Sequence, residues 1–415
     1  RSVERLGLRP FRRDALDRCE EWILARVEKS DGLGAIFPPI VNTIIALRCH
    51  GYGLDHPVLA AQIEELEKLE IEDDETLRLQ PCKSPVWDTA QALGALLECD
   101  DEEDDAAVGK AVDWLLEREV TEPGDCQIIY PEIPVGGWYF EYANEFYPDC
   151  DDTAEVVTAL ARAARRRPDD ERLRSALRRG TEWLLAMQNE DGGWASFDRS
   201  CDRELLTFIP FADHNAMIDP STVDITGRVL EALTACGFAT SHPAVRRGVE
   251  FILAQQEDDG SWYGRWGANH VYGTWLALTG LATADFDMGH PACRRAVDWL
   301  VGRQNPDGGW GESLRSYHQP EWIGRGESTA AQTAWAVMAL LAAGEVGSEA
   351  VARGVDYLVA TQAADGGWKD EHWTGTGFPE VFYLNYHYYA IYFPLLSLAG
   401  YRRARARRDS SERVA

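Results

Sequence analysis

The chain has little positive charge, and lysine in particular is scarce. Its 415 residues include 41 Lys and Arg, of which only five are Lys, against 69 Asp and Glu, and the formal net charge is −28. A protein that binds nucleic acid needs a basic surface that neutralises phosphates. The composition therefore excludes nucleic acid as a partner.

The nine cysteines and nine histidines lack the spacing of a metal or redox motif. No CxxC pair occurs, and neither does HExxH or a comparable histidine spacing. The cysteines are scattered, and several fall in or beside expected helices, which is typical of free thiols in a reducing compartment. We expect neither a metal nor an organic cofactor.

Long uncharged segments are also absent, with one exception. Residues 381–401 carry no formal charge over 21 positions, a length that would permit a membrane span. The run contains six tyrosines together with Asn385, His387 and Pro394, so a buried aromatic helix is favoured. The chain begins at Arg1 within charged helical sequence and shows no signal peptide, so we expect further protein upstream.

What the chain has in abundance is a repeat that pairs glutamine with tryptophan. In each of four copies an amphipathic helix ends at Gln, and Trp follows six residues later, after a turn that contains glycine. The turn requires positive φ, the Trp is expected to pack back on its repeat, and the Gln to bind the end of the next helix. We interpret the repeat as structural bracing. The pairs are Gln188/Trp194, Gln256/Trp262, Gln304/Trp310 and Gln362/Trp368, with weaker copies at 111–116, which lacks the closing Gly-Trp, and at 22–32.

Apolar helices that suit an inner layer alternate with amphipathic helices that suit an outer layer. This alternation predicts an all-α fold, with an (α/α)6 barrel at residues 81–405. Residues 1–80 are interpreted as part of a second α/α barrel that ends in an acidic linker at 70–75, and residues 406–415 as a charged tail. The expected inner helices are 84–98, 149–166, 221–237, 271–284, 328–343 and 381–400; the outer ones are 104–118, 172–188, 243–256, 291–304 and 348–362; the N-terminal ones are 12–28, 38–50 and 57–69.

Two long connections, 124–147 and 195–219, are rich in apolar residues, which is typical of functional loops. The first leads into the cluster Asp149-Cys150-Asp151-Asp152. Asp149 fits a helix N-cap, with Asp151 and Asp152 in the first turn, where the helix dipole favours negative charge. Three carboxylates this close also fit a strong acid that shares protons. The residues alone leave both interpretations open.

The Gln–Trp repeats and the sequence Asp149-Cys150-Asp151-Asp152-Thr153-Ala154 together resemble the squalene–hopene cyclase family of class II terpene cyclases. The resemblance spans the whole chain, and it implies the terpenoid-cyclase type of catalytic barrel preceded by the end of a second barrel. The implied activity is cyclisation of squalene or a similar linear polyprene to a hopene- or hopanol-type product. Such a reaction starts when an alkene is protonated and continues as a carbocation cascade.

The resemblance implies a role for each matching residue. Asp151 corresponds to the proton donor, Asp149 and Asp152 to carboxylates that support its charge state, Asp224 to another required acid, and Tyr272 to a tyrosine that holds a water near the donor. Aromatic faces stabilise a cation without reacting with it, by about 0.5–2 kcal/mol each. Residues that match the cavity wall are Trp87, Phe140, Phe197, Trp266, Phe378, Phe382, Tyr386 and Tyr389, with Ile36 and Pro38 from the first barrel, and Phe211 matches the constriction of the substrate entrance.

The chain departs from the family pattern at two positions. Many members pair the donor with a histidine where this chain has Arg228. An arginine stabilises the aspartate anion after proton transfer, but it cannot release a proton. Asp224 and Arg228 are four residues apart, so a pair along one helix is an alternative. Phe37 stands where a relative has glutamine near a water network, which leaves open whether water addition or deprotonation ends the reaction.

Other functions fit parts of the pattern. Oxidosqualene cyclases have a shorter motif, Asp-Cys-Thr-Ala-Glu, and the extra aspartates here favour direct protonation of an alkene. A glycosidase with paired carboxylates, a zinc-dependent prenyltransferase-like subunit and a non-catalytic helical scaffold are further alternatives. The acidic run at 100–104 is interpreted as a solvated loop rather than a magnesium–diphosphate site.

A hydrocarbon substrate dissolves in the bilayer, so the resemblance implies a membrane surface as a partner. We expect a monotopic protein on the cytoplasmic side of the membrane, and a homodimer is a further expectation. The segment Leu205–Met217 is the candidate entrance that faces the membrane, and a buried lid is the alternative for this segment.

Overall fold

The computed structural model describes residues 11–101, 104–209 and 217–414. Within these residues, six inner helices form a closed ring in the order α5, α8, α10, α12, α14 and α16, since each packs on the next and α16 packs on α5. The prediction of an α/α barrel is therefore confirmed. The inner helices are α5 (Pro85–Cys99), α8 (Cys150–Ala164), α10 (Val223–Ala235), α12 (His270–Thr283), α14 (Ala330–Ala342) and α16 (Tyr389–Val414).

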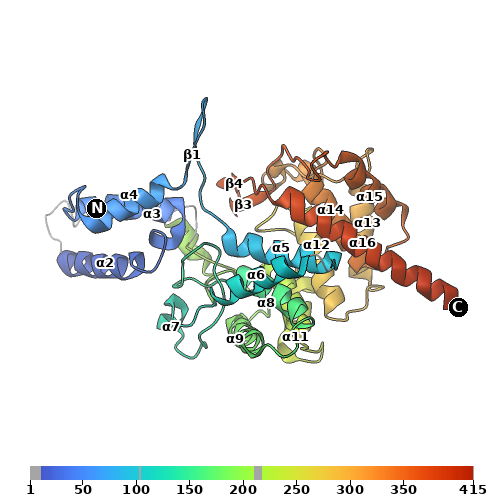
Figure 1. The fold of residues 1–415 in the computed structure, drawn as a ribbon, viewed down its shortest axis with the longest axis horizontal. Helices are drawn as coiled ribbons and strands as arrows, with labels where there is room; N and C mark the ends of the chain where they lie inside the picture. Colours follow the sequence, from blue (N-terminus) through green and yellow to red (C-terminus); the bar gives the residue numbers. More distant parts are fainter. Residues whose placement is uncertain (1–10, 102–103, 210–216, 415) are drawn as a thin grey trace.

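An outer layer of helices covers the ring, and three further helices precede it. Helices α2, α3 and α4 lie beside the barrel, and α7 lies near its lower edge in Figure 1. The outer helices are α6 (Asp105–Leu116), α9 (Glu171–Met187), α11 (Pro243–Ala254), α13 (Pro291–Arg303) and α15 (Glu349–Thr361). The others are α2 (Arg12–Val27), α3 (Phe37–Cys49), α4 (Pro57–Glu67) and α7 (Asp125–Ile129), with short 3₁₀ turns η1 (Leu33–Ala35), η3 (Glu204–Phe208), η5 (Leu314–Tyr317) and η6 (Pro320–Trp322).

The inner helices pack closely because small residues lie where they cross. A Cβ atom at Gly227 of α10 would come within 2.3 Å of the Leu276 carbonyl oxygen of α12, and one at Gly280 within 2.6 Å of the Gly227 Cα atom. The backbones of α10 and α12 can approach this closely only because both positions lack a side chain. The ring is thus tight at this crossing.

The Gln–Trp repeats brace the outer helices as predicted. The Nε2 group of Gln188 donates to the carbonyl oxygens of Gly192, 2.8 Å away, and of Ala244 at the start of α11, 2.9 Å away. The indole Nε1 of Trp194 donates back to the Leu184 carbonyl at 2.7 Å. The same bonds recur in the next two copies, and the turn glycines Gly192, Gly260, Gly308 and Gly366 have φ between 89° and 96°.

The weak copy of the repeat at 111–116 does have a closing tryptophan. Trp138 Nε1 donates to the Leu115 carbonyl at 2.8 Å, the bond that each other copy makes over ten residues. The prediction that this copy lacks the Gly-Trp was therefore wrong. A long loop separates Leu115 from Gly136-Gly137-Trp138, and regular spacing could not reveal the match.

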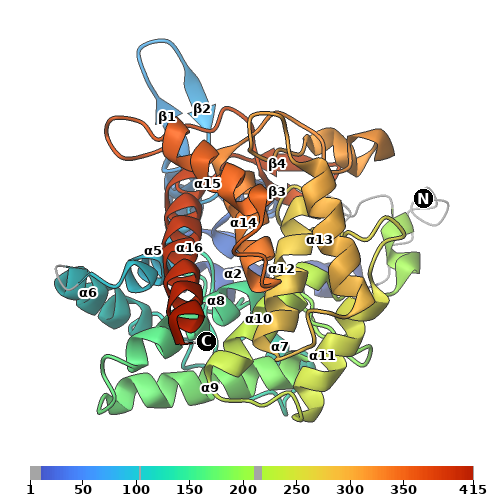
Figure 2. The same ribbon diagram turned by 90° about the vertical axis from the view of Figure 1, so that its right-hand side faces the viewer.

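The expected acidic linker at 70–75 is instead a two-stranded hairpin. Strands β1 (Glu70–Glu72) and β2 (Leu77–Leu79) pair in antiparallel register, with Glu70 opposite Leu79. The Asp73 carboxylate accepts from the backbone N–H groups of Glu75 and Thr76, at 3.0 and 2.7 Å, and so forms a tight turn. The hairpin projects from the rest of the protein (Figure 1 and Figure 2).

The inner helix expected at 381–400 begins and ends further along the chain than predicted, at Tyr389 and Val414. Strand β4 (Phe382–Leu384) pairs with β3 (Gly375–Phe378), and α16 starts only at Tyr389. At its other end α16 runs to Val414, so the predicted charged tail at 406–415 is helical through that residue. Arg403 anchors α16 to α5 through an ion pair with Glu98 at 2.5 Å. No described helix is long and apolar enough to cross a membrane.

The N-terminal segment is attached to the barrel through the loop that precedes α8. Ser30 forms a β-bridge with Asn144, and the Asp31 N–H donates to the Ala143 carbonyl at 3.1 Å. At the far end of this loop, Trp138 forms a β-bridge with Asp149. One loop therefore contacts both the N-terminal segment and the start of α8.

The bracing by glutamine can be tested by comparing two copies of the repeat. Gln188→Ala leaves two carbonyl acceptors without their donor at a buried site, so we expect the free energy of unfolding to fall by about 2–3 kcal/mol. Gln362 is exposed and donates to the Gly366 carbonyl, so Gln362→Ala is expected to cost less than about 1 kcal/mol. Urea unfolding of both variants measures the difference, and equal losses would contradict the bracing role.

Candidate active site

The acidic cluster lies at the N-terminus of α8, as the helix-cap interpretation predicted. Asp149 is the N-cap residue, and its Oδ1 atom accepts from the backbone N–H of Asp152 at 2.8 Å. The Asp149 N–H donates to the Trp138 carbonyl at 2.9 Å, which fixes the entry of the chain into the helix. Asp151 and Asp152 therefore occupy the first turn, where the partial positive charge of the helix stabilises anions.

The end of α8 faces a cavity rather than solvent. Asp149, Asp151 and Asp152 line this cavity together with Tyr272. The cluster is thus a helix cap and a group of acids in contact with an enclosed space. The structure also places in the cavity wall every residue that the sequence assigned there, namely Trp87, Phe140, Phe197, Trp266, Phe378, Phe382, Tyr386, Tyr389, Ile36 and Pro38. Their action on a substrate stays a prediction.

Many of the residues that line the cavity are aromatic, and several of their rings contact one another in a chain. The centroid of Phe140 lies 6.5 Å from that of Trp87 and 6.3 Å from that of Tyr386, and Tyr386 stacks on Tyr389 at 4.5 Å. Across the cavity, the indole of Trp266 donates to the Ser196 hydroxyl at 2.8 Å. These ring contacts hold the side chains of this part of the wall in place.

Arg228 on α10 is buried and contacts Asp151 without lining the cavity. Its Nε atom forms an ion pair with Asp151 Oδ1 at 2.5 Å, and its Nη1 atom pairs with Glu155 Oε2 at 2.7 Å. Its Nη2 atom donates to the Tyr272 hydroxyl at 2.8 Å. The Asp151 side chain is 16% exposed and lines the cavity, whereas that of Arg228 is 3% exposed. A molecule in the cavity would therefore meet Asp151 but not its cation.

Asp224 does not bind Arg228, so the alternative of a pair along α10 was wrong. Its Oδ2 atom accepts instead from the backbone N–H groups of Arg265 and Trp266, at 2.8 and 2.9 Å. Arg228 pairs instead with carboxylates on α8, the neighbouring inner helix, and not with a group on its own helix. Asp224 therefore fixes the loop that carries Trp266, a residue of the cavity wall.

The carboxyl groups at the end of α8 hold protons more tightly than an exposed aspartate. Burial raises the pKa of Asp151 to about 6, and the nearby charge of Arg228 opposes this rise. Burial raises the pKa of Asp149 to about 7 and the pKa of Asp152 well above its ordinary value, where the charge of Asp149 adds to the effect. The pair Asp149/Asp152 therefore titrates as a unit and retains a proton near neutral pH.

Two carboxylates and one hydroxyl of the site were not identified from the sequence. Glu155 pairs with Arg228, and its position four residues after Asp151 on one helix was the available signal. Glu141 lines the cavity from the aromatic loop before α8, and burial raises its pKa to about 8. Ser196 follows a repeat tryptophan, which gave no sign of a role at the site. Phe211, the predicted entrance constriction, lies outside the described residues.

Comparison with known proteins identifies what this arrangement resembles. The family model "Squalene-hopene cyclase C-terminal domain" matches residues 83–403, and "Squalene-hopene cyclase N-terminal domain" matches residues 1–75. A squalene–hopene cyclase of Zymomonas mobilis subsp. mobilis is 40% identical over 414 residues, covering 97% of this chain and 62% of that protein. One of Alicyclobacillus acidocaldarius subsp. acidocaldarius is 45% identical over 408 residues, covering 98% and 64%.

The solved structures show the same fold at low sequence identity. The type II terpene cyclase MstE from Scytonema matches with a TM-score of 0.51 and 17% identity, covering 81% of this chain and 92% of that chain. At this identity the likeness establishes the fold alone. The present chain spans less than two thirds of the length of the two cyclases above.

The proton held by the acid pair predicts a pH-dependent stability. The unfolded chain loses the Asp152 proton above about pH 4, whereas the folded protein keeps it. The contribution of this carboxyl group to the free energy of unfolding is therefore largest below pH 4. It falls by about 1.4 kcal/mol per pH unit as the pH rises toward the pKa of Asp152 in the folded protein. Asn at position 152 binds no such proton, so Asp152→Asn should match the parent protein near pH 4 and exceed its free energy of unfolding at pH 7.

Urea unfolding across this pH range measures the difference. Asp74→Asn, at the exposed tip of the hairpin, is the matched control and should follow the parent protein at every pH. A difference between Asp152→Asn and the parent protein that stays constant with pH would contradict the shared-proton assignment.

Proposed function

Because the chain belongs to the squalene–hopene cyclase family, we propose that the whole protein cyclises squalene or a similar linear polyprene to a polycyclic triterpene. The observation that carries the proposal is the Asp151–Arg228 ion pair at the wall of an aromatic cavity. It combines a proton donor, a cation that stabilises the donor after transfer, and a surface that tolerates a carbocation.

The reaction begins with a proton transfer from Asp151. The O–H bond of the acid breaks as a C–H bond forms at the terminal alkene, and the electrons of the double bond leave a tertiary carbocation. The carboxylate that remains is 2.5 Å from the Nε atom of Arg228, so its charge is compensated at once. Arg228 remains charged throughout, because an arginine does not deprotonate in a protein. The ion pair therefore favours the product side of the transfer.

The wall then protects the cation while rings form. Faces of Trp266, Phe378, Phe382 and Tyr386 border the cavity, and each offers about 0.5–2 kcal/mol to a desolvated cation. Summed over several rings, this approaches the lower end of the roughly 8–23 kcal/mol by which enzymes commonly lower a barrier. An apolar cavity also excludes water, which would end the cascade early.

The alternative of a non-catalytic scaffold fits the same observations poorly. A scaffold needs a packed barrel axis, whereas here the axis opens into a cavity that is lined by three aspartates, two of which are buried. Buried carboxyl groups destabilise a fold even when they are partly compensated, so a scaffold without a chemical use for them would gain nothing from keeping them.

We also propose that the substrate enters from a membrane surface next to η3. Leu205 and Phe208 on this turn are 78% and 79% exposed, which is unusual for large apolar side chains. Side chains of this kind can enter the interfacial region of a bilayer, where a polyprene substrate is dissolved.

The donor assignment predicts the result of a conservative substitution. Asp151→Asn keeps the shape of the side chain but carries no acidic proton, so turnover of squalene by the whole protein should fall by at least about 100-fold. Asp100→Asn, in the exposed acidic run after α5, is the matched control and should retain turnover. Mass spectrometry of the products measures both, and normal turnover by Asp151→Asn would refute the assignment.

The entrance proposal predicts a loss of membrane binding. When Leu205, Leu206 and Phe208 are all replaced by serine, we expect a smaller fraction of the whole protein to sediment with phospholipid vesicles. Ile128 and Ile129 on α7 are 69% and 68% exposed, and their replacement by serine is the control for a general loss of apolar surface. Unchanged sedimentation of the triple variant, or an equal loss in the control, would exclude η3 as the entrance.

A further inference from the structure

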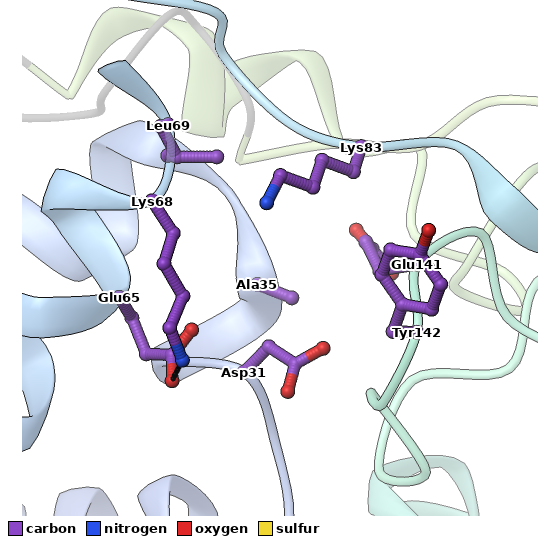
Figure 3. A pocket seen from close by; sticks show the side chains of 8 residues that line it. All are labelled: Asp31, Ala35, Glu65, Lys68, Leu69, Lys83, Glu141 and Tyr142. Carbon is purple, nitrogen blue, oxygen red and sulfur yellow. Dashed lines mark hydrogen bonds and ion pairs between the residues drawn. The ribbon is translucent and has the colours of Figure 1, made fainter.

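A second pocket lies between the N-terminal segment and the barrel, and it is polar. Asp31, Lys83 and Glu141 extend toward the same open space, and Glu65 and Lys68 form its opposite wall (Figure 3). The Lys68 side chain is 48% exposed and Tyr142 is 52% exposed, so the pocket reaches the surface. Water can therefore enter this space.

Glu141 lines both the polar pocket and the aromatic cavity. Its place follows from the loop 138–149, which bridges to Asp149 at one end and to Ser30 near the other. The Glu141 side chain is buried and accepts from the Asn144 amide at 3.1 Å. One carboxyl group therefore separates the water-accessible pocket from the acids at the end of α8.

Each catalytic cycle requires that Asp151 regain a proton. Its cationic partner cannot supply one, because the Arg228 guanidinium keeps its protons in a protein. The other acids that line the cavity beside Asp151 are Asp149, Asp152 and Glu141. Of these, Glu141 also lines the polar pocket.

We propose that Glu141 is a relay residue that returns protons from the polar pocket to Asp151 through the Asp149/Asp152 pair. The inference rests on the proposed cyclase function and adds to it the route by which the donor is reloaded. Glu141 passes its proton to the pair as the pair passes one to the Asp151 carboxylate, and Glu141 then takes a proton from water in the pocket. The proton that enters balances the one that leaves the carbocation, or the water that quenches it, when the reaction ends.

Between Glu141 and Asp151, two buried oxygen atoms have no hydrogen-bond partner in the described structure. They are Oδ1 of Asp152 and Oδ1 of Asn144, and both residues line the aromatic cavity. These residues are 2% and 5% exposed, and a buried polar atom without a partner is costly unless water or a proton satisfies it. Burial keeps the pKa of Glu141 at about 8, so this residue holds a transferable proton near neutral pH.

The test separates the first turnover from later ones. In the whole protein, Glu141→Gln keeps the side-chain shape but cannot carry a proton. At about pH 5, below the pKa of about 6 of Asp151, the donor is protonated before substrate arrives, so the first turnover in a rapid-quench experiment should proceed at the parent rate. Later turnovers should slow by about tenfold or more, which gives a burst of one product per enzyme. Glu145→Gln, on the same loop but exposed, is the control and should show no burst.

A second variant excludes a purely structural effect. Glu141→Ala leaves space beside the polar pocket, and formic acid added to the assay should restore its later turnovers at least in part. Equal slowing of the first and later turnovers, or parent rates throughout, would overturn the relay. If the parent protein itself forms no cyclic product, the proposed function fails instead, so the two failures are distinguishable.

Discussion

The buried guanidinium of Arg228 is the interaction on which the candidate site depends. It joins three inner helices, because Asp151 and Glu155 come from α8, Arg228 from α10 and Tyr272 from α12. A buried charge is tolerated only when its partners compensate it, and removal of one partner leaves the rest uncompensated in a medium of low dielectric constant. The ion pairs therefore fix the position of the acid relative to the cavity as well as its charge.

A cavity inside a barrel also needs a rigid surround. The repeat tryptophans fill the space between inner and outer helices, and three of the glutamines tie α9 to α11, α11 to α13 and α13 to α15. The inner helices then close into a ring that is tight at Gly227 and Gly280 but open at the end of α8. The same loop that closes the first repeat, through Trp138, also delivers Asp149 and Glu141 to the site.

The errors made from the sequence share a cause. The segments 70–79 and 381–388 lie between helical stretches, and their hydrogen-bond partners are set by strand pairing rather than by helical periodicity. The closing tryptophan at 138 was missed because its loop breaks the regular spacing of the repeat. Helices with a strong apolar pattern, by contrast, were located to within a few residues, because burial of one face dictates their extent.

The sequence by itself determined the alternating helices, the repeat and the cap at Asp149, and its resemblance to a family indicated the aromatic residues that line the cavity. These features are local, or they follow from motifs that carry their own geometry. Only the tertiary structure decided that Arg228 binds Asp151 and Glu155 rather than Asp224, and that Glu141 borders two pockets. The reason is distance along the chain: Arg228 and Glu155 are 73 residues apart, and only the packing of α8 against α10 brings them into contact.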